Sequence, residues 1–413
     1  MMLMSVEAPA DGATGNDAGA TALAARQAKI AEFLASRGGP FYELQSRLRL
    51  LHENALQSGK RAILFVALAW GVPLLLGLPR SFSLDHGQGG YLTDPGVWAK
   101  FFIAVAAFVL AEQQVERGLR IKLAQLVRAP LIAPTSLPRA ADAIASALRQ
   151  RDSRTAEVVC LSLALAAALF SYGNLHTTQA SSWAVLHGPD GNTITAAGWW
   201  TICVSLPLFV FLLLRGIWRH FVGAQLLRKI AKLELRLVAA HPDGKGGLGF
   251  LAQYPNAYMF FVFGMSSAIA AAVAKHLLQE SLSMTTFSMI MGGWLAIVLA
   301  LFAYPLSAFS QPLARLKETG LLMLGTQATR FHRAAERKVL GRNVLTDATP
   351  EPEEDIADPT KLFETTRKLS SMLVSRTAVV PVAAAALIPF AVAGATKLPF
   401  KEVFSVLKKL LLL

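Results

Sequence analysis

The chain has 413 residues, of which 54% are apolar and only 16% are charged, whereas about a quarter of an ordinary soluble domain is charged. There are 40 Lys and Arg against 27 Asp and Glu, which gives a net charge of +13. The composition excludes intrinsic disorder, which requires low hydrophobicity, and argues against a nucleic-acid partner. Two cysteines, Cys160 and Cys203, are too few for a disulfide scaffold or a Cys-rich zinc module. We therefore expect an integral membrane protein.

The N-terminal region has two parts. Residues 1–22 are small and acidic and lack the basic and apolar regions of a secretory signal, so we expect a disordered tail. Residues 23–61 have apolar side chains at helical spacing, which predicts an amphipathic cytoplasmic helix. These side chains are Leu34, Phe41, Leu44, Leu48 and Leu51. The helix is expected to pack on other cytoplasmic helices or to lie on the membrane surface.

Apolar segments that approach the roughly 20 residues needed to cross a bilayer occur six times up to residue 310. They are residues 62–78, 97–111, 156–175, 196–218, 257–274 and 286–310. A seventh apolar block, residues 378–395, contains Pro381 and Pro389. Proline inside a span is tolerated where neighbouring helices satisfy the freed carbonyl group. The predicted fold is an all-α, polytopic bundle of six or seven spans, with three hairpins over residues 62–376.

Lys and Arg are distributed unevenly between the loops, and this distribution predicts the orientation. Four stretches contain 7, 8, 6 and 11 of these residues, 32 of the 40; they are residues 1–61, 112–154, 219–257 and 311–376. The intervening loops contain one, Arg80. We therefore expect the N-terminus and the long basic loops to be cytoplasmic.

The C-terminal block, residues 377–413, leaves two alternatives open. If residues 378–395 span the membrane, the lysines of the tail lie outside, against the positive-inside rule; if the block is re-entrant, the tail stays inside. These lysines are Lys397, Lys401, Lys408 and Lys409. Residues 399–413 are predicted to form a short amphipathic helix at an interface.

The second, fourth and sixth spans are each followed by a sequence that predicts a long cytoplasmic helix. The helix of the second span is expected to reach Pro130, that of the fourth His241, and that of the sixth Gly341. At 1.5 Å per residue, such extensions project about 30 to 45 Å. No stretch shows the strand–helix alternation of an α/β catalytic domain.

The most distinctive motif is HPDGKGGLGFL at residues 241–251. Glycines permit positive φ, and the backbone amides of such a loop suit an anion or a phosphate. The candidate ligand- or anion-binding residues are His241, Asp243, Lys245, Gly246, Gly247 and Gly249. A structured turn is the alternative, and the Walker spacing is absent. His241 and Asp243 alone are weak evidence for metal binding, so no metal site is expected.

This motif, with the segments ADPTKLFETTRKLSSMLVSRTAVVPVAAAALIPF and PFKEVFSVLKKLLLL, resembles a family of uncharacterised bacterial multi-spanning inner-membrane proteins. The similarity covers roughly residues 200–413. The family pattern HPD-x-x-GGLGFL is kept here, with Gly244 and Lys245 at the variable positions. The resemblance implies a multi-pass protein of the bacterial cytoplasmic membrane and carries no known activity.

Ionisable groups near the bilayer form a second set of candidates, because they are costly in lipid and often functional. Glu112 and Glu116 lie where the second span is expected to leave the membrane. They are candidates for a water-filled vestibule; the alternative is an exposed helix in which Arg120 pairs with Glu116. Glu157 and Arg215 also lie at predicted span ends, where solvent or snorkelling accounts for them.

Catalytic motifs such as Gly-x-Ser-x-Gly, His-Glu-x-x-His and Cys-x-x-Cys are absent from the sequence. We therefore expect no cofactor and favour a non-enzymatic function, first as an oligomeric channel or transport component. The alternative is a membrane-embedded sensor or scaffold that recruits a cytoplasmic or membrane partner. A third hypothesis is an enzyme that acts on lipids through His241 and Asp243. The expected partners are the lipid bilayer, further copies of the chain and a cytoplasmic protein.

Overall fold

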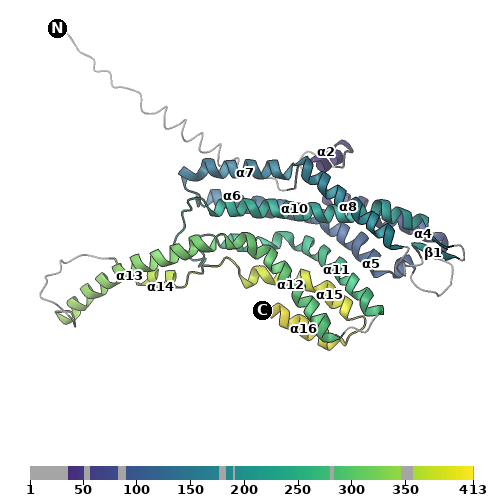
Figure 1. The fold of residues 1–413 in the computed structure, drawn as a ribbon. Coiled ribbons are helices and arrows are strands. Elements are labelled where there is room, and N and C mark those ends of the chain that lie inside the picture. The colour runs from purple at the N-terminus through teal and green to yellow at the C-terminus, as the bar shows by residue number, and fades with distance from the viewer. Residues whose placement is uncertain are drawn as a thin grey trace, which may run out of the picture.

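The computed structural model describes residues 36–50, 56–81, 90–175, 183–188, 191–279, 283–345 and 357–412. The predicted tail over residues 1–22 lies outside these residues. Within the described chain the fold is an all-α bundle with one short β-hairpin (Figure 1). Seven of its helical segments are long and apolar enough to cross a membrane. The predicted polytopic helical bundle is therefore confirmed.

The first half of the bundle runs from α2 to α10. Its helices are α2 (Pro40–Arg47), α3 (Ser58–Val66), α4 (Val72–Ser81), α5 (Pro95–Val97), α6 (Val105–Arg128), α7 (Leu137–Arg151), α8 (Arg154–Leu175), α9 (Ala196–Trp200) and α10 (Leu206–Ala231). Short π-helical turns, Ala67–Gly71, Trp98–Ala104 and Thr201–Ser205, join α3 to α4, α5 to α6 and α9 to α10. An antiparallel hairpin of β1 (Val185–Gly188) and β2 (Gly191–Ile194) lies between α8 and α9.

The second half contains α11 (Met259–Gln279), α12 (Met284–Ser307), α13 (Ser310–Leu340), α14 (Thr360–Arg367), α15 (Arg376–Gly394) and α16 (Phe400–Leu412). The two halves share one apolar core. At the contact, an added Cβ on Gly216 of α10 would lie only 2.1 Å from the Phe261 ring of α11. Glycine at this position therefore allows the two spans to approach closely.

One end of the bundle, at which α6 and α10 finish and α13 begins, is called the basic end below. Its cations include Arg128, Arg228, Lys232 and Arg315. α13 leaves the bundle at this end (Figure 1), and at 1.5 Å per residue its 31 residues extend about 46 Å. Pro312 lies in the first turn of α13, where the missing amide costs no helical hydrogen bond.

The seventh block forms α15, a 19-residue helix with an apolar sequence. Its length of about 28 Å is close to the roughly 30 Å of a bilayer core. α15 runs antiparallel to α12: its start lines a cavity with Leu306 of α12, and an added Cβ on Gly394 at its end would lie 2.6 Å from the Phe287 ring near the start of α12.

The amphipathic helix α16 turns back beside α12 and does not lie flat across the end of the bundle. An added Cβ on Gly394 at the end of α15 would lie 3.3 Å from Val403, and one on Gly292 within α12 would lie 4.0 Å from Leu410. The C-terminus consequently lies beside the middle of α12 (Figure 1). Lys408 and Lys409 are exposed, whereas their neighbours Leu407 and Leu410 pack against the core.

Two helix predictions are wrong in the described residues. The helix after the fourth span ends at Ala231, because the alternating sequence Leu-Glu-Leu-Arg-Leu at residues 233–237 favours an extended chain. The backbone of this extended chain forms a hydrogen bond with the segment before α7, from Arg236 N–H to Leu131 O at 2.8 Å. The single amphipathic helix predicted over residues 23–61 is interrupted in the described part, which contains the eight-residue α2 and the first residues of α3, and Leu44 of α2 is 54% exposed.

Candidate functional site

The glycine loop, residues 241–251, is folded around the carboxylate of Asp243. This carboxylate accepts hydrogen bonds from the backbone N–H groups of Lys245 at 2.7 Å, Gly247 at 3.2 Å and Gly249 at 2.8 Å. Its oxygen also lies 2.8 Å from Nδ1 of His241. The amides that the sequence offered to an external anion therefore already bind an anionic group of the loop itself.

The pKa of Asp243 reflects this arrangement. Partial burial on its own raises the pKa of the carboxyl group, but the three backbone donors and the His241 ring outweigh it, so the pKa lies below its usual range. Hydrogen bonds to the ionised form stabilise that form. The carboxylate is thus held ionised as the centre of the loop.

Lys245 connects the glycine loop to the chain just before α15. Its ammonium group donates to the carbonyl oxygens of Met372 at 2.9 Å and Val374 at 3.3 Å. Burial lowers its pKa, and the nearby Asp243 raises it in part. Lys245 therefore bonds protein carbonyl groups, and its role toward an external ligand stays a prediction.

The glycines of the loop have structural reasons for their identity. Gly246 has φ of +65° and Gly247 +93°, a region that glycine adopts without strain. An added Cβ on Gly246 would lie 3.1 Å from Leu316 of α13, and one on Gly249 would lie 2.9 Å from the Asp243 carboxylate. The loop lies against the start of α13 and joins the two halves of the bundle at the basic end.

Glu112 and Glu116 belong to a buried cluster of charges, called the arginine–glutamate cluster below. Its members come from the segment before α2 and from α3, α6, α8 and α10: Arg37, Arg61, Glu112, Glu116, Glu157, Arg215 and Arg219. Their formal charges are four positive and three negative. Burying charges is costly unless they pair closely, so the members hold one another in place.

Glu112 is the centre of this cluster. It accepts from Arg61 at 2.7 Å and from Arg215, and Arg219 lies 4.0 Å away. The side chain of Glu112 is 11% exposed, and those of Arg61 and Arg215 are 2% and 4% exposed. Three helices, α3, α6 and α10, are therefore joined through one carboxylate.

The other two carboxylates fix the segment before α2 and the first turn of α2 to the bundle. Glu116 bonds the Arg37 side chain at 2.9 Å and the Ser36 backbone N–H at 3.3 Å. Glu157 accepts from the Phe41 N–H at 2.7 Å and from Arg215 at 3.1 Å. The exposed Glu116–Arg120 pair offered as an alternative is wrong, because Glu116 is only 6% exposed and its partner is Arg37.

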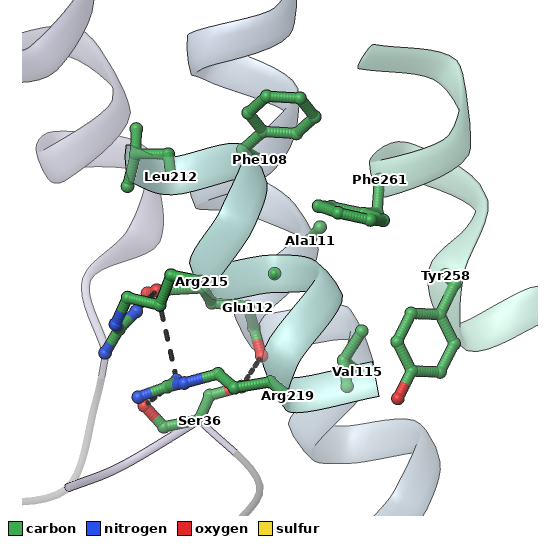
Figure 2. Close-up of a pocket in the computed structure, with 11 residues that line it drawn as sticks. Ser36, Phe108, Ala111, Glu112, Val115, Leu212, Arg215, Arg219, Tyr258 and Phe261 are labelled. Carbon is green, nitrogen blue, oxygen red and sulfur yellow. Dashed lines mark hydrogen bonds and ion pairs between the residues drawn. The ribbon is translucent and has the colours of Figure 1, made fainter. Parts of the chain in front are cut away.

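A cavity of about 40 Å³ lies beside the cluster. Figure 2 shows Glu112, Arg215, Arg219 and Ser36 on one side of it, and Phe108 and Phe261 on the other. This volume exceeds the roughly 10–15 Å³ that one water requires on such a measure and is far below the roughly 300 Å³ of a small-molecule site. A role of Glu112 and Glu116 in a water-filled vestibule stays a prediction.

Sequence reasoning attributed Arg215 and Glu157 to solvent or snorkelling and missed the ion pairing of the cluster, although a signal was present. Glu112 and Glu116 are four residues apart, as are Arg215 and Arg219, so each pair occupies one face of its helix. Two spans with opposite charges at the same spacing and the same end favour a direct pairing. The sequence around Arg37 and Arg61 shows no such spacing, so their membership of the cluster was not predictable in this way.

Within the described residues, no group of three or more His, Cys, Asp or Glu side chains lies close enough to hold a metal ion.

A separate aromatic group surrounds His220, whose ring nitrogens lie 3.3 Å from Leu301 O and from the Tyr254 hydroxyl. Comparison with family models, with curated proteins and with solved structures found no match for this chain.

Proposed function

We propose that this protein is a membrane-embedded scaffold that recruits a cytoplasmic protein through the far end of α13. The observation that carries the proposal is an apolar surface at that end, called the α13 tip: Val339, Leu340, Val344 and Leu345. These side chains are 81%, 58%, 72% and 85% exposed. Burying such a side chain contributes about 1.5–3 kcal/mol, so their exposure favours a binding surface.

The α13 tip has a defined conformation. Gly341, with φ of +75°, ends α13, and the chain then folds back onto the last turns of the helix. The side chain of Asn343 is 2% exposed; it donates to Arg333 O at 2.9 Å and to Glu336 at 2.8 Å and accepts from Arg337. A preorganised apolar surface loses less entropy on binding, which supports a recognition role.

Charges around the α13 tip indicate the chemistry of the partner. Lys338 and Arg342 are exposed beside the four apolar side chains. Electrostatic complementarity favours a partner of opposite charge. The proposed partner is therefore a protein with an apolar groove and an acidic rim.

The proposal places the protein in a bacterial inner membrane, with the basic end and the N-terminus on the cytoplasmic side. The 32 cations of the four basic stretches support this orientation through the positive-inside rule, and the family resemblance supports the bacterial membrane. In this orientation α13 carries its tip into the cytoplasm.

Extraction of the complex from its native membrane in mild detergent, followed by a mass measurement, tests the scaffold function. The wild-type chain is expected to run together with a second polypeptide, and Leu345→Asp is expected to run without it. Leu322→Asp is the matched control, because Leu322 is 69% exposed on α13 but lies about five turns from the tip. If the purified complexes of the wild type, Leu345→Asp and Leu322→Asp all have the same mass, the proposal is contradicted. It is also contradicted if the second polypeptide in the wild-type complex is only another copy of the chain.

A specific observation favours a second function, that of an oligomeric channel or transport component. Lys408 and Lys409 are exposed beside the middle of α12, where a cation in lipid costs about 2.5–3.5 kcal/mol. An aqueous path between copies of the chain would hydrate them and would favour anions. Anion flux into proteoliposomes that falls in Lys408→Gln would support this function; absence of flux from the wild-type oligomer would contradict it.

A further inference from the structure

The two halves of the bundle form the walls of an open cavity of about 680 Å³ at the basic end. Its walls are the end of α10, the extended residues 233–237 and the first turns of α13. Three cations line it: Arg228 and Lys232 from α10 and its C-cap, and Arg315 from α13. Among the described residues of its lining there is no Asp or Glu.

The positive charge of this cavity is not neutralised by the described part of the chain. None of the three cations forms an ion pair with a described acidic residue. Arg228 donates to Tyr304 O at 3.0 Å, and its guanidinium carbon lies 4.4 Å from the centre of the Tyr304 ring. These contacts fix the direction of Arg228 and leave its charge available to an anion.

Helix electrostatics accounts for only part of this arrangement. Cations at the C-terminal end of α10 stabilise its dipole, which explains Arg228 and Lys232. Arg315 lies near the N-terminal end of α13, where the dipole gives no reason for a cation. That N-terminal end also lines the cavity through Gln311 and Pro312, and it favours an anion in the same place.

Much of the rest of the lining is apolar. Leu233, Leu235 and Leu237 point to the cavity from the extended segment, and Leu316 from α13. The apolar helix α12, a candidate span of 24 residues, ends at Ser307, directly before the residues of α13 that form one wall. Basic pockets between helices near the end of a span suit the headgroups of acidic phospholipids.

We propose that this cavity binds the phosphate-bearing headgroup of an acidic phospholipid, with the adjoining part of its chains against the leucines. The three cations supply the charge that a phosphate requires, and the leucines supply an apolar surface that a free phosphate would leave uncovered. Since α10 belongs to the first half of the bundle and α13 to the second, the bound lipid bridges the two halves.

Thermal unfolding of the delipidated full-length protein in detergent tests this site. Phosphatidylglycerol is expected to raise the unfolding temperature in a saturable manner, whereas phosphatidylcholine and inorganic phosphate leave it nearly unchanged. Arg315→Gln and Lys232→Gln are each expected to weaken the apparent affinity for phosphatidylglycerol about tenfold, the loss of one charge-assisted contact. Only variants with the wild-type elution profile in size-exclusion chromatography are compared.

Lys229→Gln is the matched control. Lys229 lies on the same turn of α10 as Lys232, but its ammonium group donates to Ser146 of α7 at 3.1 Å and does not line the cavity. It should keep the wild-type affinity. Equal affinity in all variants, equal loss in the control, or equal stabilisation by phosphatidylcholine would overturn the site; equal stabilisation by inorganic phosphate would overturn the lipid as its ligand.

Discussion

Replacement of Glu112 by glutamine tests whether the arginine–glutamate cluster stabilises the bundle. The substitution keeps the size of the side chain and removes the charge that faces Arg61 and Arg215. Removing one partner of a buried ion pair costs about 3–5 kcal/mol, because the remaining charge is left without compensation. Glu157 still contacts Arg215 at 3.1 Å, so we expect a loss at the lower end, about 3 kcal/mol.

The loss can be measured as the change in free energy of unfolding in detergent, followed by tryptophan fluorescence, with reversibility established first. Asp142→Asn is the matched control, since Asp142 is exposed on α7 at the same end of the molecule; it should change the stability by less than about 0.5 kcal/mol. A loss in Glu112→Gln no larger than that of the control would refute the proposed role of the cluster.

A double-mutant cycle makes the same test independent of the size of each single effect. In Glu112→Gln with Arg215→Gln, both charges of the contact are absent. Residues in one network show coupling energies of about 0.5–3 kcal/mol. The double variant is therefore expected to lose less stability than the sum of the two single variants. Strict additivity would show that the two side chains do not interact.

Three further substitutions give distinct expected outcomes. Asp243→Asn should lower the unfolding temperature at neutral pH. Because the folded-state pKa of Asp243 is depressed, the stability that its carboxylate contributes is present above the unfolded-state pKa of about 3.9 and is lost as the pH falls through the folded-state pKa. The difference in unfolding temperature from wild type should therefore shrink in acid, and a pH-independent difference would contradict this reasoning. Gly39→Ala should release the segment before α2, detected as faster proteolysis there, because Gly39 has φ of +88° and an added Cβ would lie 2.7 Å from Glu157; unchanged proteolysis would argue against this contact. Gly216→Ala should destabilise the contact of α10 with α11 by about 1–3 kcal/mol in chemical unfolding, because the new methyl group would overlap Phe261; wild-type stability would mean that the ring can move aside.

The membrane-spanning part of the fold was predictable because bilayer thickness imposes a long apolar run on each span. α12 and α15 follow the predicted residues 286–310 and 378–395 closely. The extended residues 233–237 were missed because helical and alternating patterns both fit a short sequence rich in leucine. The backbone contact of this segment with Leu131 and Ile132 is a tertiary contact, which local sequence does not contain.

The candidate site was predictable to a smaller degree. The glycine loop was identified from its composition, but the use of its amides by Asp243 depends on backbone geometry that residue types alone do not define. The burial of Glu112 depends on Arg61, which lies 51 positions away in the sequence. Such pairing between distant segments follows from how the spans pack, and a single sequence carries no direct record of it.

Site-specific photo-crosslinking in living cells tests the central proposal, recruitment by the α13 tip, most directly. A photoreactive residue at Leu345 is expected to give one discrete product with another protein, and this product should disappear when Val344 is replaced by Asp. The same residue at Gln327, exposed on the middle of α13, should give no such product. No product at Leu345, or the same product at both positions, would contradict the account.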